Sequence, residues 1–304
     1  MNLDSMWLLQ GTMFLLVVTG FLMRKKNIFP PETKGVMTDM VLSLILPCNI
    51  VTSFRSEFNA DVLGKLVTVL IVGVCAQIVS YLVNMAAYNK YEPGKKKVFQ
   101  YGTLVSNAGF LGNPVAEGVY GSIGLMYASV YCIPLRVVMW SAGIALFTDK
   151  TDKKAAVKKV VLHPCMIGLY LGLFLMITGI SLPGFVENTV TMVGRCTTPL
   201  TMLLIGCFIA GIEDFRSVFT PDILYFCAIR IVLIPLILFM GCRLFHVDSV
   251  ITGTSVLLAS MPAGSTTAIL AAKYGGDYVF GTKLVVFSTL LTLLSIPVWC
   301  LVLM

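Results

Sequence analysis

Apolar runs of about 20 residues or more follow one another along the chain and are separated by short polar segments. Runs of this length and composition predict helices that cross a lipid bilayer. The first run, from Met6 to Met23, has an acidic start and is followed by three basic residues, so it predicts a retained helix rather than a cleaved signal peptide. With ends defined to within several residues, the pattern predicts ten spans at 5–23, 35–54, 62–88, 98–119, 122–147, 161–180, 186–211, 220–244, 249–274 and 278–303.

One predicted span contains a segment that a regular helix does not accommodate. The stretch from Ser106 to Pro114 combines two Asn, two Gly and a Pro. Proline removes a backbone donor and glycine lowers helix propensity, so this span is predicted to break. Because lipid cannot satisfy the freed backbone groups, such a break must be buried in protein or line a cavity.

The chain is predicted to consist of two halves joined by a charged linker. Pro31 and Pro47 are 16 residues apart, and so are Pro183 and Pro199, which indicates a weak internal repeat. Each half contains five predicted spans, an odd number, so the second half is inserted upside down relative to the first. The predicted units are a first repeat at 1–148, a cytoplasmic linker at 149–160 and a second repeat at 161–304.

The second half contains a matching break. Ser106 lies 14 residues before Tyr120, and Ser260 lies 14 residues before Tyr274, so the stretch 260–267 is the predicted partner. Two broken helices in corresponding positions of inverted halves are expected to meet near the midplane, where carriers of this kind bind their substrate. Half-helix N-termini direct free amides and positive dipole ends into the space between them, so an anion is the expected ligand.

Composition and charge support a membrane protein and set its orientation. Hydrophobic residues make up 57% of the sequence and charged residues 12%, too few for the surface of a soluble domain. Basic residues are concentrated in the first, third and fifth loops, so these loops are predicted to be cytoplasmic and both termini outside. The net charge of +7 is then explained by basic loop residues that set the topology and lie beside anionic lipid, and no nucleic-acid partner is expected.

Three segments resemble the auxin efflux carrier family: residues 107–114, residues 260–277 and the pair Leu46-Pro47. This family covers bacterial permeases for organic acids such as malate and malonate together with the plant PIN-formed auxin transporters. The resemblance implies an all-α, ten-helix fold of two inverted repeats, like that of the sodium/proton antiporters and bile-acid symporters. In that fold spans four and nine cross at broken prolines, and the absence of a long central loop favours a bacterial-type permease.

The resemblance also implies a mechanism and an assembly. Spans one, two, six and seven would form a scaffold that makes a homodimer, and spans three to five and eight to ten would form a moving transport domain. Transport would then follow elevator-type alternating access. The expected location is the cytoplasmic membrane, with the chain crossing it many times.

The resemblance places a substrate site at the crossing. Asn107 matches the Asn that holds the substrate carboxylate in the plant branch, and Arg136 lies where the plant pattern has a substrate-facing Gln. Since a guanidinium group binds carboxylates in a bidentate fork, a smaller or more highly charged acid than auxin is expected. The other candidate substrate-binding positions are Pro47, Asn49, Asn113, Pro262, Gly264, Ser265 and Thr266, and the helix-crossing positions are Gly109, Gly112, Pro114 and Pro262.

Several of these residues have a structural alternative. Asn107 either binds a ligand or bonds between packed helices, and Arg136 either faces the substrate or pairs structurally. Arg230 either neutralises freed carbonyls at the crossing or faces the substrate. Arg195 either faces an aqueous vestibule or is structural, and Glu117 either carries a coupling proton or is a near-surface carboxylate.

Other classes of function fit the sequence less well. The two histidines, His163 and His246, lie near predicted span ends, so no metal site, cofactor site or catalytic site is expected and the protein is not predicted to be an enzyme. The nine Cys show no Cys-x-x-Cys spacing and are predicted to be packing residues. A cation/proton antiporter or sodium-coupled symporter on the same fold remains an alternative, although neither break contains an Asp or Glu. A non-transporting membrane sensor or subunit is the third class.

Overall fold

The computed structural model describes residues 3–30, 32–55, 60–147, 153–211, 219–274 and 276–303. Pro31 and residues 149–152 of the predicted linker lie outside this part of the chain. Every regular element in the described ranges is a helix, including three π-helical segments marked η. In chain order they are α1 (Leu3–Lys25), α2 (Thr33–Met40), η1 (Val41–Ile45), α3 (Leu46–Ser53), α4 (Ala60–Ala87), α5 (Pro93–Leu104), η2 (Ala108–Gly112), α6 (Asn113–Trp140), α7 (Ala142–Ala145), α8 (Lys153–Val161), α9 (Pro164–Thr178), α10 (Gly184–Arg195), α11 (Thr197–Ala210), α12 (Pro221–Cys227), η4 (Ala228–Leu233), α13 (Ile234–Leu244), α14 (Ser249–Ala259), α15 (Thr266–Lys273) and α16 (Tyr278–Leu303).

Six helical stretches of the described chain are long and apolar enough to cross a membrane. They confirm the predicted class, an all-helical protein that crosses the membrane several times, whereas the division into ten spans and two inverted repeats stays a prediction. The six stretches are Thr33–Ser53, Ala60–Ala87, Ala108–Trp140, Gly184–Ala210, Pro221–Leu244 and Tyr278–Leu303.

Helix α9 is shorter than its predicted span because both ends are fixed by local chemistry. Pro164 occupies the first turn, where its missing amide is not needed, and the His163 ring accepts a hydrogen bond from the Cys165 amide. Gly179 ends the helix in the left-handed region at φ 66°, a conformation that glycine adopts without strain. The helix therefore ends at Thr178 and not at 180.

Each π-helical segment ends just before a proline. Pro47, Pro114 and Pro235 occupy the second position of the α-helix that follows η1, η2 and η4, respectively. A π-turn locally replaces the i→i−4 hydrogen-bond pattern that proline disrupts, so the helices continue through these prolines. The first break of the chain therefore lies at 105–107, before η2, and Pro114 itself lies in the first turn of α6.

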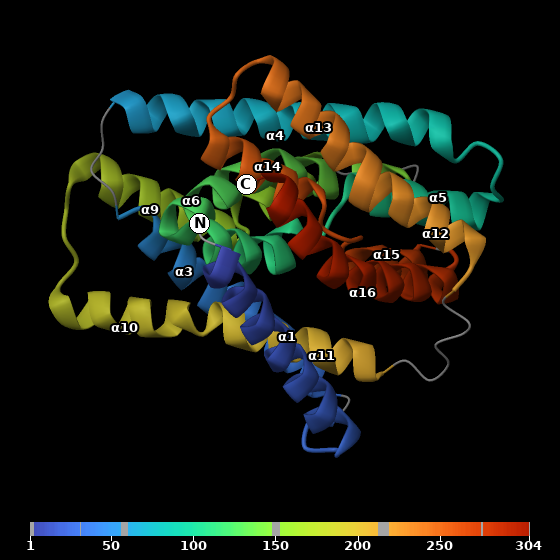
Figure 1. Ribbon diagram of the computed structural model, residues 1–304, viewed down its shortest axis with the longest axis horizontal. Coiled ribbons are helices and arrows are strands. Elements are labelled where there is room, and N and C mark those ends of the chain that lie inside the picture. The colour runs from blue at the N-terminus through green and yellow to red at the C-terminus, as the bar shows by residue number, and fades with distance from the viewer. Residues whose placement is uncertain are drawn as a thin grey trace.

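Glycines bring helix backbones into contact on one side of the molecule. A Cβ atom on Gly20 would lie 2.0 Å from the Leu203 carbonyl oxygen, and one on Gly206 would lie 2.0 Å from that of Val17. Helix α1 therefore lies directly across α11 (Figure 1). Close approach through small residues is typical of helix packing in membranes.

Helix α3 is held in the same way between two neighbours. A Cβ atom on Gly168 of α9 would lie 2.8 Å from the Pro47 carbonyl oxygen, and one on Gly194 of α10 would lie 2.9 Å from the Asn49 Cα. The five helices α1, α3, α9, α10 and α11 thus form one packed group. They correspond to predicted spans one, two, six and seven.

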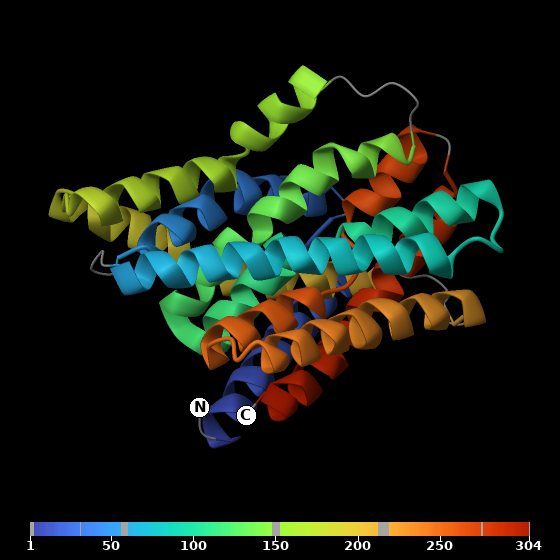
Figure 2. The ribbon, with the colours of Figure 1, turned by 90° about the horizontal axis from the view of Figure 1, so that it is seen from above.

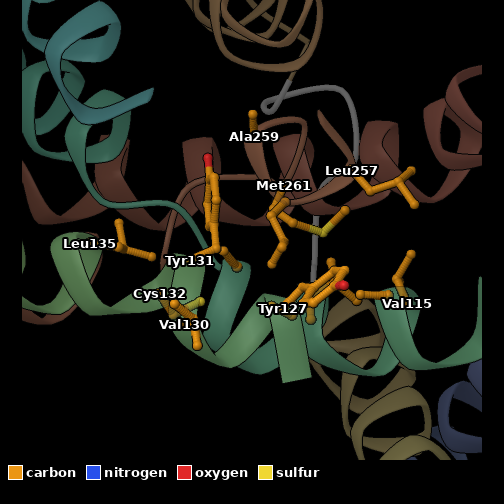
Figure 3. Packing of buried hydrophobic residues seen from close by; sticks show 14 of the residues in the cluster. Val115, Tyr127, Val130, Tyr131, Cys132, Leu135, Leu257, Ala259 and Met261 are labelled. Carbon is orange, nitrogen blue, oxygen red and sulfur yellow. The ribbon is translucent and has the colours of Figure 1, made fainter. Parts of the chain in front are cut away.

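Helix α6 runs through the middle of the molecule, between α4 and the group just described (Figure 1). Tyr127, Tyr131 and Leu135 of α6 are buried against Leu257 and Met261, which belong to α14 and the segment after it (Figure 3). Seen from above, α4 extends along the length of the molecule and α8 projects away from it (Figure 2). The core therefore surrounds the two segments at which the helices are interrupted.

Candidate binding site at the crossing of two interrupted helices

The two predicted breaks lie against each other. Between α5 and η2 the chain is non-helical at Val105 to Asn107, and between α14 and α15 it is non-helical around Pro262 and Gly264. The Asn107 amide donates to the Pro262 carbonyl at 2.8 Å, and the Gly264 amide donates to the Val105 carbonyl at 2.9 Å. These bonds form an antiparallel bridge between Ser106 and Ala263. Each break thus provides hydrogen-bond partners for backbone groups of the other, and lipid could not supply such partners.

Arg230 stabilises the same crossing from η4. Its side chain is 3% exposed, its Nε donates to the Met261 carbonyl at 3.2 Å, and its Nη1 donates to the Thr103 carbonyl at 3.3 Å. One guanidinium group therefore donates hydrogen bonds to a backbone carbonyl near the start of each break. Of the two roles considered from the sequence, this geometry matches the neutralisation of freed carbonyls.

Two residues that sequence reasoning missed also hold the crossing. The Ser288 hydroxyl of α16 accepts a hydrogen bond from the Ala263 amide at 3.3 Å. The Tyr101 hydroxyl of α5 donates to the Thr266 hydroxyl at 3.1 Å. Only the tertiary arrangement places them beside the breaks, so the sequence carries no signal for them.

Asn107 is the last residue before η2 and presents a set of unused donors. Its carbonyl accepts from the amides of Leu111 and Gly112 at 2.9 and 3.3 Å, which closes the first π-turn. Within the described ranges, the amides of residues 108–110 have no backbone acceptor and the Asn107 side chain has no hydrogen-bond partner. Asn107, Gly109 and Phe110 are half-buried. This half-helix N-terminus therefore has the free amides and the positive dipole end that favour an anion.

Arg136 lies beside this N-terminus. The side chain is only 5% exposed, and its Nη2 atom lies 3.8 Å from the position that a Cβ atom on Gly109 would take. Among the described residues its partners are sulfur atoms of α9: the Met166 thioether, at 3.8 Å from Nη1, and the Cys165 thiol, and both are weak acceptors.

No carboxylate of the described residues neutralises Arg136. The ion pairs found there join Arg55 to Glu187, Lys65 to Asp61 and Lys95 to Asp222. A buried guanidinium group with sulfur atoms as its acceptors has unused donors. The structure therefore brings Asn107, Gly109 and Arg136 together as a site that can bind a carboxylate.

The second break supplies the opposite wall. Gly264 is buried, and a Cβ atom there would lie 3.1 Å from the Val105 carbonyl oxygen, so the crossing favours glycine. Ser265 is exposed, Thr266 is half-buried, and the buried Thr267 hydroxyl lacks a hydrogen-bond partner in the described chain. Helix α15 begins here, so a second half-helix N-terminus faces the crossing region.

Asn113 and Gly112 lie deeper than the first break. Asn113 is fully buried; its Oδ1 accepts from the Cys132 thiol at 3.9 Å, and its Nδ2 has no partner in the described chain. A Cβ atom on Gly112 would lie 2.8 Å from a Leu258 methyl group of α14. These positions pack η2 and α6 against α14.

Asn49 and Glu117 are joined directly. The Asn49 side chain is 4% exposed, and its Nδ2 donates to Glu117 Oε2 at 2.7 Å. Glu117 is half-buried on α6 and therefore does not lie freely at the surface, whereas Arg195 at the end of α10 is exposed. The structure thus links two candidate residues that the sequence treated separately.

Two pockets are found among the described residues. One has a volume of about 530 Å³ and is an apolar groove between α4 and α6. The other, of about 650 Å³, lies between α3, α9 and α10 and is flanked by the ion pair of Arg55 and Glu187. Neither is lined by Asn107 or Arg136. No group of three metal-binding side chains occurs among the described residues.

Comparisons with known proteins point to one family. A family model described as "Membrane transport protein" matches residues 12–300. An uncharacterized transporter of Methanothermobacter thermautotrophicus is 26% identical over 299 residues, which cover 96% of both chains. One of Methanocaldococcus jannaschii is 22% identical over 294 residues, or 94% of both chains. The uncharacterized transporter YfdV of Escherichia coli K12 is 19% identical over 300 residues, which cover 94% of this chain and 93% of its own.

Proposed function

The chain belongs to the membrane transport protein family of the auxin efflux carriers, and from this premise we propose that it is a secondary carrier for a small organic anion. The proposed substrate is a carboxylate such as malate or malonate. The single observation that carries the substrate class is Arg136, a buried cation with no carboxylate partner among the described residues, beside the free amides of residues 108–110. An ionisable residue inside a membrane protein marks a substrate pathway by default, and Arg recognises carboxylates bidentately.

The proposed mechanism is alternating access of the elevator type. The group of α1, α3, α9, α10 and α11 is held by backbone contacts at glycines and is suited to a fixed scaffold that forms a homodimer. The crossed helices carry Asn107 and Arg136, and they would move the bound anion past this scaffold. In the proposed orientation the protein lies in the cytoplasmic membrane with both termini outside.

Ligand binding to purified protein tests the site. Malate, malonate, succinate and indole-3-acetate would be titrated calorimetrically into wild type, Asn107→Ala and Arg136→Ala. Hydrogen bonds to a charged group contribute about 1.5–3 kcal/mol, so each variant is expected to bind the preferred acid at least about tenfold more weakly. Arg243→Ala is the matched control, since Arg243 is exposed at the end of α13. Unchanged affinity in both site variants would refute the proposed site.

A further inference from the structure

The hydrogen bond between Asn49 and Glu117 connects two separately anchored parts of the molecule. Asn49 is fixed on α3, because Gly194 of α10 packs directly on its backbone. Glu117 lies in the first turns of α6, directly after η2, which packs against α14 at Gly112. The carboxylate thus belongs to the crossed helices, and its amide partner belongs to the group proposed as the scaffold.

No cation of the described part of the chain compensates Glu117. Its hydrogen-bond donor is a neutral amide, and no charged side chain of the described residues acts on it electrostatically. The cations that follow α3 and that lie on α4 and α10 are paired or exposed: Arg55 with Glu187, Lys65 with Asp61, and Arg195. On α3, which carries Asn49, the titratable group is the Cys48 thiol, and on α6 the titratable group that follows Glu117 is the Tyr120 phenol; both types of group are uncharged at neutral pH.

We propose that Glu117 is the proton-binding group of this carrier, and that its proton travels with the anion. The proposal rests on the proposed function. In the observed arrangement the carboxylate accepts the Asn49 amide hydrogen. If the crossed helices move, an ionised Glu117 must leave this donor and remain a buried charge without a partner, which is costly. A proton taken from water on one side converts it to a neutral carboxylic acid, and release to water on the other side restores the carboxylate. The empty carrier then returns, and the carboxylate regains the Asn49 amide as its donor.

A proton on Glu117 changes the net charge that crosses the membrane with the anion. Arg136 stays protonated throughout because a guanidinium group does not lose its proton in proteins. A malonate or malate dianion that crosses with one proton on Glu117 carries one net negative charge instead of two, so a negative cell interior opposes its uptake less. An anion that crosses alone is driven outward. Glu117 therefore couples uptake of the anion to the proton gradient.

Infrared difference spectroscopy of purified protein tests proton binding without any substrate. The spectrum of wild type in acidic against alkaline buffer is expected to show the carbonyl band of a protonated carboxylic acid. Glu117→Gln should lose this band. Glu187→Gln should keep it, because Glu187 forms an ion pair with Arg55 at 2.6 Å. An identical band in wild type and Glu117→Gln, or no titrating band in wild type, would overturn the proposal whatever the protein transports.

Uptake of radiolabelled malonate into proteoliposomes tests coupling. Wild type and Glu187→Gln are expected to take up more malonate when the outside is more acidic than the inside, and Glu117→Gln should lose this stimulation. Stimulation that persists in Glu117→Gln contradicts the proposal, and so does a wild type that responds to a sodium gradient but not to a pH gradient. If no malonate enters in any protein, the proposed function fails while the infrared result still decides whether Glu117 binds a proton.

Discussion

Arg230 and Arg136 are both buried, yet their surroundings give them different roles. Arg230 donates to two backbone carbonyls that the breaks leave without helical partners, so its charge is used to hold the crossing together. Arg136 has sulfur atoms as its acceptors and lies beside free amides. Both positions stood out in the sequence as cations in apolar runs. Only the acceptors that surround them separate the two roles, because these acceptors come from other helices.

Arg230→Gln is expected to lower the stability of the protein. The shorter side chain cannot reach both the Met261 and Thr103 carbonyls, and a buried acceptor left unsatisfied costs about 1–3 kcal/mol. The melting temperature in detergent, followed by circular dichroism, should fall relative to wild type. Arg243→Gln, at an exposed position, should melt as wild type does. Equal melting temperatures for both variants would show that Arg230 does not hold the crossing.

At the scale of helices, composition alone predicted where a regular helix fails but not its detailed course. The Asn, Gly and Pro residues of 106–114 placed a break in this segment, and the spacing to Tyr120 placed its partner at 260–267. The structure places the non-helical residues at 105–107 and accommodates Pro114 after a π-turn. A π-turn forms when an amide bonds to the carbonyl five residues earlier instead of four. Helix propensities of single residues do not predict this change of partner.

The contact between α1 and α11 gives a sharp test at the same scale. Gly20→Ala would place a methyl group 2.0 Å from the Leu203 carbonyl oxygen, so the helices must separate. Overpacking of this kind costs about 1–3 kcal/mol and occasionally more, and the melting temperature should fall. Gly11→Ala on the same helix meets nothing within 4 Å and should not lower it, because alanine is the better helix former. A Gly20→Ala protein as stable as Gly11→Ala would contradict the described packing.

At the scale of the whole molecule, the hydropathy pattern predicted a helical membrane protein because the period and length of apolar runs are local properties. The pairing of the two breaks was also predicted, from the equal spacings of Ser106 to Tyr120 and of Ser260 to Tyr274, and the structure confirms it. The link between Asn49 and Glu117 was not predicted. It joins residues 68 positions apart on helices whose relative placement depends on glycine contacts with α9 and α10.

Alternating access requires water to reach the crossing, and Ser265 reports whether it does. Ser265 is exposed at the second break, while Ser129 is fully buried on α6. After replacement of the nine native cysteines, Ser265→Cys is expected to react with a membrane-permeant thiol reagent, and malonate should slow the reaction by occupying the crossing. Ser129→Cys should not react. Complete protection of Cys at 265 under all conditions would mean that the crossing only holds the fold together. Labelling that malonate slows would place water and the anion at the same half-helix ends, as a carrier requires.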